Sequence, residues 1–277
     1  MNVSRSDLLE NVSRNLPPSL ALNYLTLRRA LGIIGICLPW GIIAFYLFDS
    51  GEKELRTSIS AYYYSGMRDF FVGSLLTIGI FLVAYRGNHD RETKMATWAG
   101  LGAILVALCP TGRRCIEDGA AEILFFAQNC ELTISHSVDY FLWPEWLFEP
   151  VSYVHYAAAG VFFFNVARLS YFVFTETSDT AEKLPEGRGR LSPEAKARRN
   201  RRYKGYGLVI AVCIVLMGAD FLLNYFGFNT DPWKPVFWIE VVAVWTFATA
   251  WLEKGEALAA TRNLMPTRDG SEPQKSV

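Results

Sequence analysis

Long apolar blocks alternate along the chain with short segments that carry nearly all of its charged residues. A helix that crosses the ~30 Å hydrocarbon core of a bilayer needs roughly 20 mostly apolar residues. Helices are expected here because an open sheet would leave backbone groups unpaired in lipid. The pattern therefore predicts an all-α, polytopic transmembrane helix bundle within residues 1–255. Its six expected spans are residues 31–48, 70–85, 95–109, 151–174, 206–228 and 236–251.

The distribution of Lys and Arg predicts how these spans are oriented. The segments before span 1, between spans 2 and 3, between spans 4 and 5, and after span 6 hold 4, 3, 9 and 4 basic residues, which is 20 in total. The three segments on the opposite side hold 3, 2 and 1, which is 6 in total. Basic residues are retained on the cytoplasmic side of membranes. We therefore expect both termini to be cytoplasmic (N-in/C-in).

Three segments outside the spans have distinct compositions. Residues 110–150, between spans 3 and 4, are long and rich in aromatic side chains, and we expect them to form an ordered outer cap. Residues 175–205 form a basic linker and residues 256–277 a polar tail, both expected to be cytoplasmic. Before the first span, the Pro17-Pro18 pair is expected to interrupt any helix.

The overall composition adds little beyond this segregation of charge. Hydrophobic residues make up 51% of the chain, and the formal net charge is zero. Of the five cysteines, Cys115 and Cys130 lie in the cap, where an oxidising compartment would favour a disulfide. Cys109 is the competing partner. Nucleotide-binding, metalloprotease, hydrolase-elbow and EF-hand motifs are not found in the sequence.

Ionisable groups at similar depth in four spans are the main candidates for function. Asp69, His155, Asp220 and Glu240 all lie near the outer ends of their expected spans. Buried charges in a membrane are costly and often mark functional sites. One interpretation is an outward-facing polar pocket below the cap, and the other is a network in which arginines neutralise these acids and tie the helices together.

A segment rich in polar and aromatic residues leads into the second span and supplies further candidates. Arg56, Ser58 and Arg68 are expected to bind a ligand together with Asp220 and Glu240. If the pocket is catalytic, Asp69 or His155 would act as general base and Arg68 as an anion-binding donor. We expect no bound metal, with a mixed metal site from His136, His155 and Asp69 as a further alternative. The sequence does not indicate a cofactor.

The run Ser58-Ile-Ser60-Ala-Tyr62-Tyr63-Tyr64, followed by Arg68-Asp69, resembles a block in bacterial six-span integral membrane proteins of uncharacterised activity. Isolated residues are also similar to the CREST superfamily of membrane hydrolases and receptors. That resemblance implies catalytic roles for Ser60, Asp69 and His155. The chain differs from the CREST pattern in having six expected spans rather than seven, no H-x-x-x-H pair and few histidines.

These observations predict a protein of the bacterial inner membrane that binds or processes a lipid or small amphiphile. If it is an enzyme, the expected class is a membrane-embedded hydrolase. One alternative is a transporter or channel that uses Asp220 and Glu240 as an ion or proton relay. Another is a non-enzymatic sensor or assembly subunit. Expected partners are membrane lipids, with anionic headgroups at residues 196–204. Nucleic acid is not an expected partner.

Overall fold

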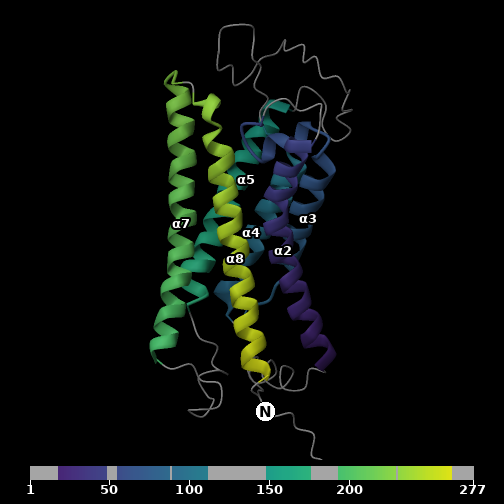
Figure 1. Ribbon diagram of the computed structural model, residues 1–277, viewed down its shortest axis with the longest axis vertical. Helices are drawn as coiled ribbons and strands as arrows, with labels where there is room; N and C mark the ends of the chain where they lie inside the picture. The colour runs from purple at the N-terminus through teal and green to yellow at the C-terminus, as the bar shows by residue number, and fades with distance from the viewer. Residues whose placement is uncertain are drawn as a thin grey trace, which may run out of the picture.

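The computed structural model describes residues 18–48, 55–87, 89–111, 148–175, 193–228 and 230–263. All regular secondary structure among these residues is helical, which confirms the all-α prediction (Figure 1). A π-helical turn, η3 (Leu169–Val173), continues α5, and two short 3-10 helices are η1 (Ser60–Tyr64) and η4 (Asp231–Trp233). The α-helices are α2 (Pro18–Phe48), α3 (Arg68–Ala84), α4 (Asp90–Leu108), α5 (Phe148–Arg168), α7 (Pro193–Tyr225) and α8 (Pro235–Asn263).

Successive α-helices run in opposite directions, so the described start of α2 and the described end of α8 lie at the same end of the bundle (Figure 1). We call this end the inner end and the opposite one the outer end. Contacts between helices agree with this arrangement, since α2 packs mainly on α8, α3 on α4, and α4 on α5. Between α7 and α8 the chain reverses after Gly227, whose φ of 88° is readily adopted only by glycine.

Among the described residues, four helices are long and apolar enough to cross a membrane: Thr26–Phe48, Pro150–Val173, Pro193–Tyr225 and Pro235–Lys254. This indicates a transmembrane protein. The other two helices are less clear by length and composition. α3 has 17 residues, or about 26 Å at 1.5 Å per residue, and α4 carries four charged side chains in its first five residues.

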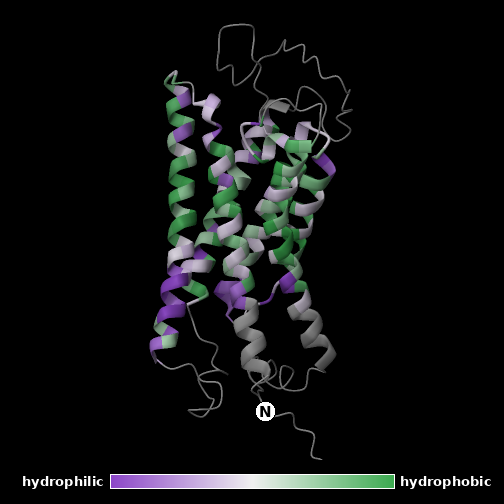
Figure 2. Cartoon of the chain, viewed as in Figure 1, coloured by the Kyte–Doolittle hydropathy of each residue, from purple (hydrophilic) through white to green (hydrophobic). Residues whose placement is uncertain are grey.

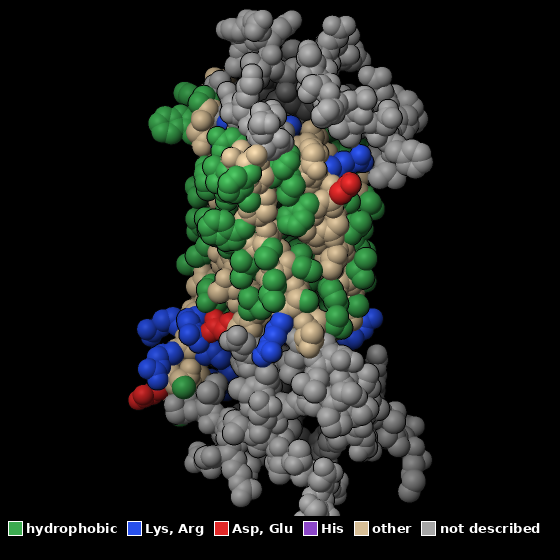
Figure 3. Space-filling view, turned by 45° about the vertical axis from the view of Figure 1, so that its right-hand side comes forward, with side chains coloured by type: hydrophobic (Ala, Val, Ile, Leu, Met, Phe, Trp, Pro, Cys, Tyr) green, Lys and Arg blue, Asp and Glu red, His purple; other side chains and the backbone are tan. Residues whose placement is uncertain are grey.

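The surface of the bundle has an apolar middle and a strongly charged inner end. Hydrophobic side chains cover the middle of the visible face, and Lys and Arg gather at the inner end (Figure 3). Along α7, the residues change from hydrophilic at the inner end to hydrophobic in the middle of the bundle (Figure 2). Large apolar side chains remain exposed there, including Val215 at 69% and Leu208 at 59%. A bilayer would cover such a surface.

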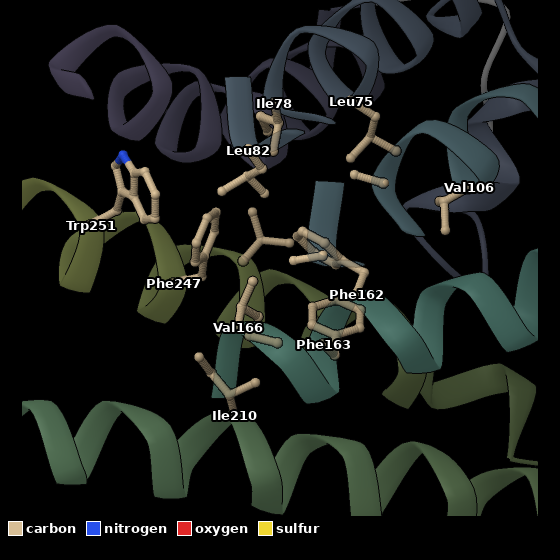
Figure 4. Packing of buried hydrophobic residues seen from close by; sticks show 14 of the residues in the cluster. Leu75, Ile78, Leu82, Val106, Phe162, Phe163, Val166, Ile210, Phe247 and Trp251 are labelled. Atoms are coloured by element: carbon tan, nitrogen blue, oxygen red, sulfur yellow. The ribbon is translucent and has the colours of Figure 1, made fainter. Parts of the chain in front are cut away.

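Small residues let neighbouring helices approach closely inside the bundle. A Cβ atom added to Gly100 would lie 2.6 Å from the carbonyl oxygen of Gly79, and one added to Gly102 would lie 2.8 Å from that of Ala158. Gly160 of α5, in contrast, has no atom of another described helix within 4 Å of its added Cβ. Between these contacts, apolar side chains from α3, α4, α5, α7 and α8 form one core (Figure 4).

Helices extend further toward the inner end than the apolar blocks predict. α2 begins at Pro18 and continues into the first span, because proline is tolerated in the first turn of a helix. α7 begins at Pro193 and therefore includes the basic run at 196–204, which the sequence had placed in a linker. Residues 112–147 of the predicted cap, 176–192 of the predicted linker and the end of the predicted tail, 264–277, lie outside the described residues.

Candidate functional site

The outer end is organised by the tyrosine segment, which we define as residues 58–64. The hydroxyl oxygen of Ser58 accepts a hydrogen bond from the amide of Ala61 at 3.0 Å and lies 3.3 Å from that of Ser60. A serine in this position stabilises the first turn of a helix. The next turn is closed by the amide of Tyr62, which donates to the carbonyl of Ile59 at 3.1 Å. These local bonds produce the 3-10 helix η1.

Glu240 of α8 fixes the tyrosine segment to the bundle. Its carboxylate accepts a hydrogen bond from the amide of Ile59 at 2.6 Å and a second from the amide of Ser60. One turn earlier on α8, Phe237 packs against the ring of Tyr62, with centroids 6.3 Å apart. Phe237 and Tyr62 are both fully buried. A carboxylate that binds backbone amides in this way is stabilised at a depth where an unpaired charge would be costly.

Two arginines lie against tyrosines of this segment. The guanidinium of Arg68 donates to the hydroxyl of Tyr63 at 3.1 Å and lies 4.7 Å from its ring centroid. The guanidinium of Arg56 lies 5.8 Å from the ring centroid of Tyr62. Both arginines are half-buried. A guanidinium carries five N–H donors, so one bond to Tyr63 leaves Arg68 able to bind an anion as well.

The third tyrosine connects the segment to α4 and α5. The hydroxyl of Tyr64 donates to the carbonyl of Thr111 at 2.6 Å, and the hydroxyl of Thr111 donates to that of Tyr156 at 3.1 Å. Close by in the chain, Nδ1 of His155 lies 2.7 Å from the carbonyl oxygen of Cys109. His155 is 2% exposed. It therefore joins the start of α5 to the end of α4.

Asp220 belongs to a separate network where α7 ends. Its Oδ1 accepts a hydrogen bond from the hydroxyl of Thr230 at 2.6 Å, and its Oδ2 accepts one from the side-chain nitrogen Nδ2 of Asn224 at 3.1 Å. The same nitrogen of Asn224 lies 2.7 Å from the hydroxyl of Thr230. Asp220 and Asn224 are both buried. This network holds the connection to α8 against the end of α7.

The structure brings some of the predicted site residues together and separates others. Ser58, Ser60 and Glu240 meet at η1, with Arg56 and Arg68 on the adjacent tyrosines. Asp220 and His155 have other partners, and Asp69 is exposed in the first turn of α3. Within the described part of the chain, no hydrogen bond joins Ser60, Asp69 and His155 to one another.

Metal and disulfide chemistry find limited support in the described residues. Groups of three or more His, Cys, Asp or Glu side chains that could hold a metal are not found among them. His136, Cys115 and Cys130 lie outside the described residues, so the predicted metal alternative and the predicted disulfide remain predictions. Cys109, the competing disulfide partner, is a buried free thiol.

A buried cluster at the inner end was not predicted from the sequence. Arg28 donates to the hydroxyl of Tyr85 at 3.0 Å, and that hydroxyl donates to Oε1 of Glu92 at 2.5 Å. The guanidinium of Arg28 also lies 4.4 Å from the ring centroid of Trp251. Arg28, Glu92 and Trp251 are each at most 3% exposed. Helices α2 and α4 therefore bury charged side chains around Tyr85, which follows α3, and α8 adds the indole of Trp251.

The same cluster continues across the end of α5. Phe174 packs between Tyr203 of α7 and Trp251, at centroid distances of 5.7 and 5.9 Å. Its carbonyl accepts a hydrogen bond from the ammonium of Lys254 at 3.4 Å. Tyr203 and Lys254 are buried. We call Arg28, Tyr85, Glu92, Phe174, Tyr203, Trp251 and Lys254 the inner cluster.

Sequence reasoning missed the inner cluster because its charged members lie beyond the apolar blocks. Arg28 and Lys254 were counted as charges of the segments that flank the first and last spans. Charged residues that recur just inside the ends of several helices could have signalled the cluster.

Comparison with known proteins adds no relative: no family model, curated protein or solved structure matches this chain.

Proposed function

We propose that this chain is a six-span membrane protein, with both termini cytoplasmic, that binds an anionic amphiphile at its outer end. Arg68 would bind the headgroup, and the neighbouring apolar surface of α2 and α3 would contact the hydrocarbon tail. The arrangement of Arg68 on Tyr63 carries this proposal. It places a guanidinium with spare donors at the rim of an apolar surface.

The position of Arg68 suits the boundary between water and lipid. It is the first residue of α3, at the outer end, and its guanidinium bonds to the hydroxyl of Tyr63 rather than to a carboxylate among the described residues. Tyrosine side chains favour this boundary because they combine an apolar ring with a polar hydroxyl. The resulting pair can bind a carboxylate or phosphate through the remaining N–H groups of the arginine.

Exposed apolar side chains lie near the outer ends of α2 and α3. Phe70, two residues after Arg68, is 38% exposed, and its ring lies against Gly41 of α2. At the end of α2, Leu47 and Phe48 are 65% and 87% exposed. A headgroup on Arg68 would therefore place an acyl chain along exposed side chains of both helices. Binding of an amphiphile rather than of a small polar ion follows from this adjacency.

The geometry favours binding over hydrolysis. The proposed catalytic residues Ser60 and His155 have partners within the protein, Ser58 and the carbonyl of Cys109, while Asp69 is exposed. A nucleophile and its base need to be within hydrogen-bond reach of each other. We therefore keep the proposal to binding.

Titration of the purified protein with oleate and with monoolein tests this proposal, because the two share an acyl chain and differ in headgroup charge. We expect oleate to bind more tightly, and Arg68→Gln to weaken oleate binding about tenfold, as the loss of a charged hydrogen bond implies. Binding of monoolein should change little. The quenching of tryptophan fluorescence by brominated forms of both lipids would report the affinities.

Arg91→Gln is the matched control, because Arg91 is an exposed arginine at the inner end, in the first turn of α4. It removes the same charge and should leave oleate binding unchanged. Equal affinity for the two lipids, or equal effects of the two substitutions, would contradict the proposal.

A further inference from the structure

Hydrogen-bond donors gather around Trp251 in the inner cluster. The guanidinium of Arg28 lies over the indole ring, and the ammonium of Lys254 follows three residues later on α8. Figure 4 shows the indole nitrogen of Trp251 directed away from Phe247, toward the side on which α2 lies. Tyr203 lies within electrostatic range of Arg28 on the other side of Phe174. Side chains of α2, α7 and α8 thus converge on one buried position together with Phe174, which follows η3.

Two of these donors have no hydrogen-bond partner in the described part of the chain. They are Nε1 of Trp251 and the hydroxyl of Tyr203. Trp251 is 2% exposed and Tyr203 is 0% exposed, so bulk water does not reach them. An indole N–H can only donate, and leaving such a group unpaired in an apolar setting is costly. In the described part of the chain, neither atom is hydrogen-bonded to an acceptor.

Donors dominate the chemistry of the cluster. A guanidinium offers five N–H groups, an ammonium three and an indole one, and none of these can accept. The main acceptor within the cluster is the carboxylate of Glu92, which already binds the hydroxyl of Tyr85. Nearby, the carboxylate of Glu253 forms an ion pair with Arg202, although both of its oxygens are buried without a hydrogen-bond partner in the described part of the chain. An added group that fits this setting must be rich in acceptors and negatively charged.

The depth of the cluster narrows the choice. Trp251 lies 16 residues after Pro235, the first residue of α8, which is about 24 Å along the helix at 1.5 Å per residue. If Pro235 lies at the outer boundary of a hydrocarbon core of ~30 Å, Trp251 lies in the inner part of that core, about 6 Å from its inner boundary. Arg199 and Arg202 of α7 add positive charge at the same end.

We propose that the inner cluster binds a phosphate group, either free phosphate or the phosphate of a lipid headgroup, through Arg28, Lys254 and Nε1 of Trp251. A phosphate supplies only acceptors, and a guanidinium can bind two of its oxygens side by side. This site is at the opposite end of the bundle from Arg68. It therefore stands whether or not the outer end binds an amphiphile.

The change in melting temperature of delipidated protein on adding inorganic phosphate tests the site, with chloride at equal ionic strength as reference. The same measurement with phosphatidylglycerol and with diacylglycerol, which lacks the phosphate, distinguishes the two sources. Stabilisation by free phosphate supports a free anion. Stabilisation by phosphatidylglycerol alone, with no effect of diacylglycerol, supports a lipid headgroup.

Trp251→Phe removes the indole N–H and keeps an aromatic ring beneath Arg28. We expect this variant to bind phosphate about five- to tenfold more weakly, as one lost hydrogen bond implies. Phosphate should therefore raise its melting temperature less. Arg28→Lys keeps the charge but removes the fork of donors and should weaken binding as well. Trp238→Phe is the control, because Trp238 is a half-exposed tryptophan of the same helix near the outer end.

Three results would overturn the proposal. The first is equal stabilisation by phosphate and chloride together with no difference between phosphatidylglycerol and diacylglycerol. The second is wild-type binding by Trp251→Phe, and the third is an equal loss in Trp238→Phe. Arg68→Gln should leave phosphate binding intact, so failure at one end of the bundle is distinguishable from failure at the other.

Discussion

Single residues at the outer end show how this protein tolerates carboxylates at membrane depth. Glu240 binds the amides of Ile59 and Ser60, and Asp220 binds Thr230 and Asn224. Each acid therefore meets a donor from another segment of the chain, and among the described residues neither is paired with an arginine. Such bonds stabilise a buried charge and at the same time fix two segments to each other.

Replacing Glu240 tests how much of the outer end depends on its carboxylate. Glu240→Ala leaves the buried amides of Ile59 and Ser60 without an acceptor, which should cost about 2–3 kcal/mol. We expect a fall in melting temperature of roughly 5 °C or more. Glu240→Gln keeps an accepting oxygen and should cost about half as much. Equal melting temperatures for the two variants would show that the carbonyl oxygen does not replace the carboxylate.

His155 is expected to stabilise the protein through its bond to the carbonyl of Cys109. His155→Ala removes that bond and leaves a cavity, so the free energy of unfolding should fall by about 2–4 kcal/mol. The loss should be the same with and without a metal chelator when melting is followed by circular dichroism. Tyr153→Ala, at an exposed site on the same helix, is the control. A chelator that destabilised only the wild type would instead indicate a bound metal.

The sequence predicted which polar residues would be unusual, but not their partners. Asp220 and Glu240 stood out because charges are rare inside apolar blocks. Their actual partners include backbone amides and a threonine from a loop, and backbone groups carry no signal in a single sequence. Arg28 and Lys254 were overlooked for a different reason. A charge near the end of a helix can extend outward to water or be buried against a neighbour, and only the packing decides which.

Helix contacts in this bundle depend on individual glycines, and Gly102 of α4 gives the sharpest test. A Cβ atom at this position would lie 2.8 Å from the carbonyl oxygen of Ala158 and 2.9 Å from the amide nitrogen of Phe162. Both are backbone atoms of α5 and cannot move aside cheaply. We expect Gly102→Ala to lower stability by about 1–3 kcal/mol, as overpacking usually does.

Gly160→Ala provides the comparison on the partner helix, because nothing lies within 4 Å of its added Cβ. Alanine has a higher helix propensity than glycine, so this variant should be stabilised by up to about 1 kcal/mol. Thermal melting in the same detergent measures both. Destabilisation by Gly160→Ala would indicate that a second chain or a tightly bound lipid covers this face.

Elements were predictable where hydrophobicity decides their position, and less so where it does not. The predicted span 70–85 lies within two residues of α3 at each end. At the inner end the helices continue past their apolar blocks, as α7 does from Pro193 through its basic run. Arg and Lys are good helix formers, so a helix that has left the hydrocarbon need not stop there. Hydropathy marks the boundary of the apolar surface and not the end of the helix.

At the scale of the whole molecule, the two ends are built differently. Basic side chains dominate the inner end of the visible surface (Figure 3), while the outer end is held by the tyrosine segment and its bond to Glu240. The chain reverses between α3 and α4 within a few residues, and α3 packs extensively on α4. If this α3–α4 hairpin crosses the membrane, the protein has six spans. If it does not, only the four helices with the clearest composition are spans.

Accessibility of single cysteines from the two sides of the membrane answers that question. We expect Trp233→Cys, at a side chain that is 81% exposed at the outer end, to react with an impermeant maleimide in intact cells. Glu194→Cys, exposed at the start of α7, should react only after permeabilisation. Six spans require Asp90→Cys, exposed at the start of α4, to behave like Glu194→Cys. Labelling of the unaltered protein gives the background from its native cysteines.

Because α3 and α4 are packed between α2 and α5, a hairpin outside the membrane would need the bundle to separate. Reaction of Asp90→Cys in intact cells would therefore contradict both the six-span topology and the packing on which the outer site depends.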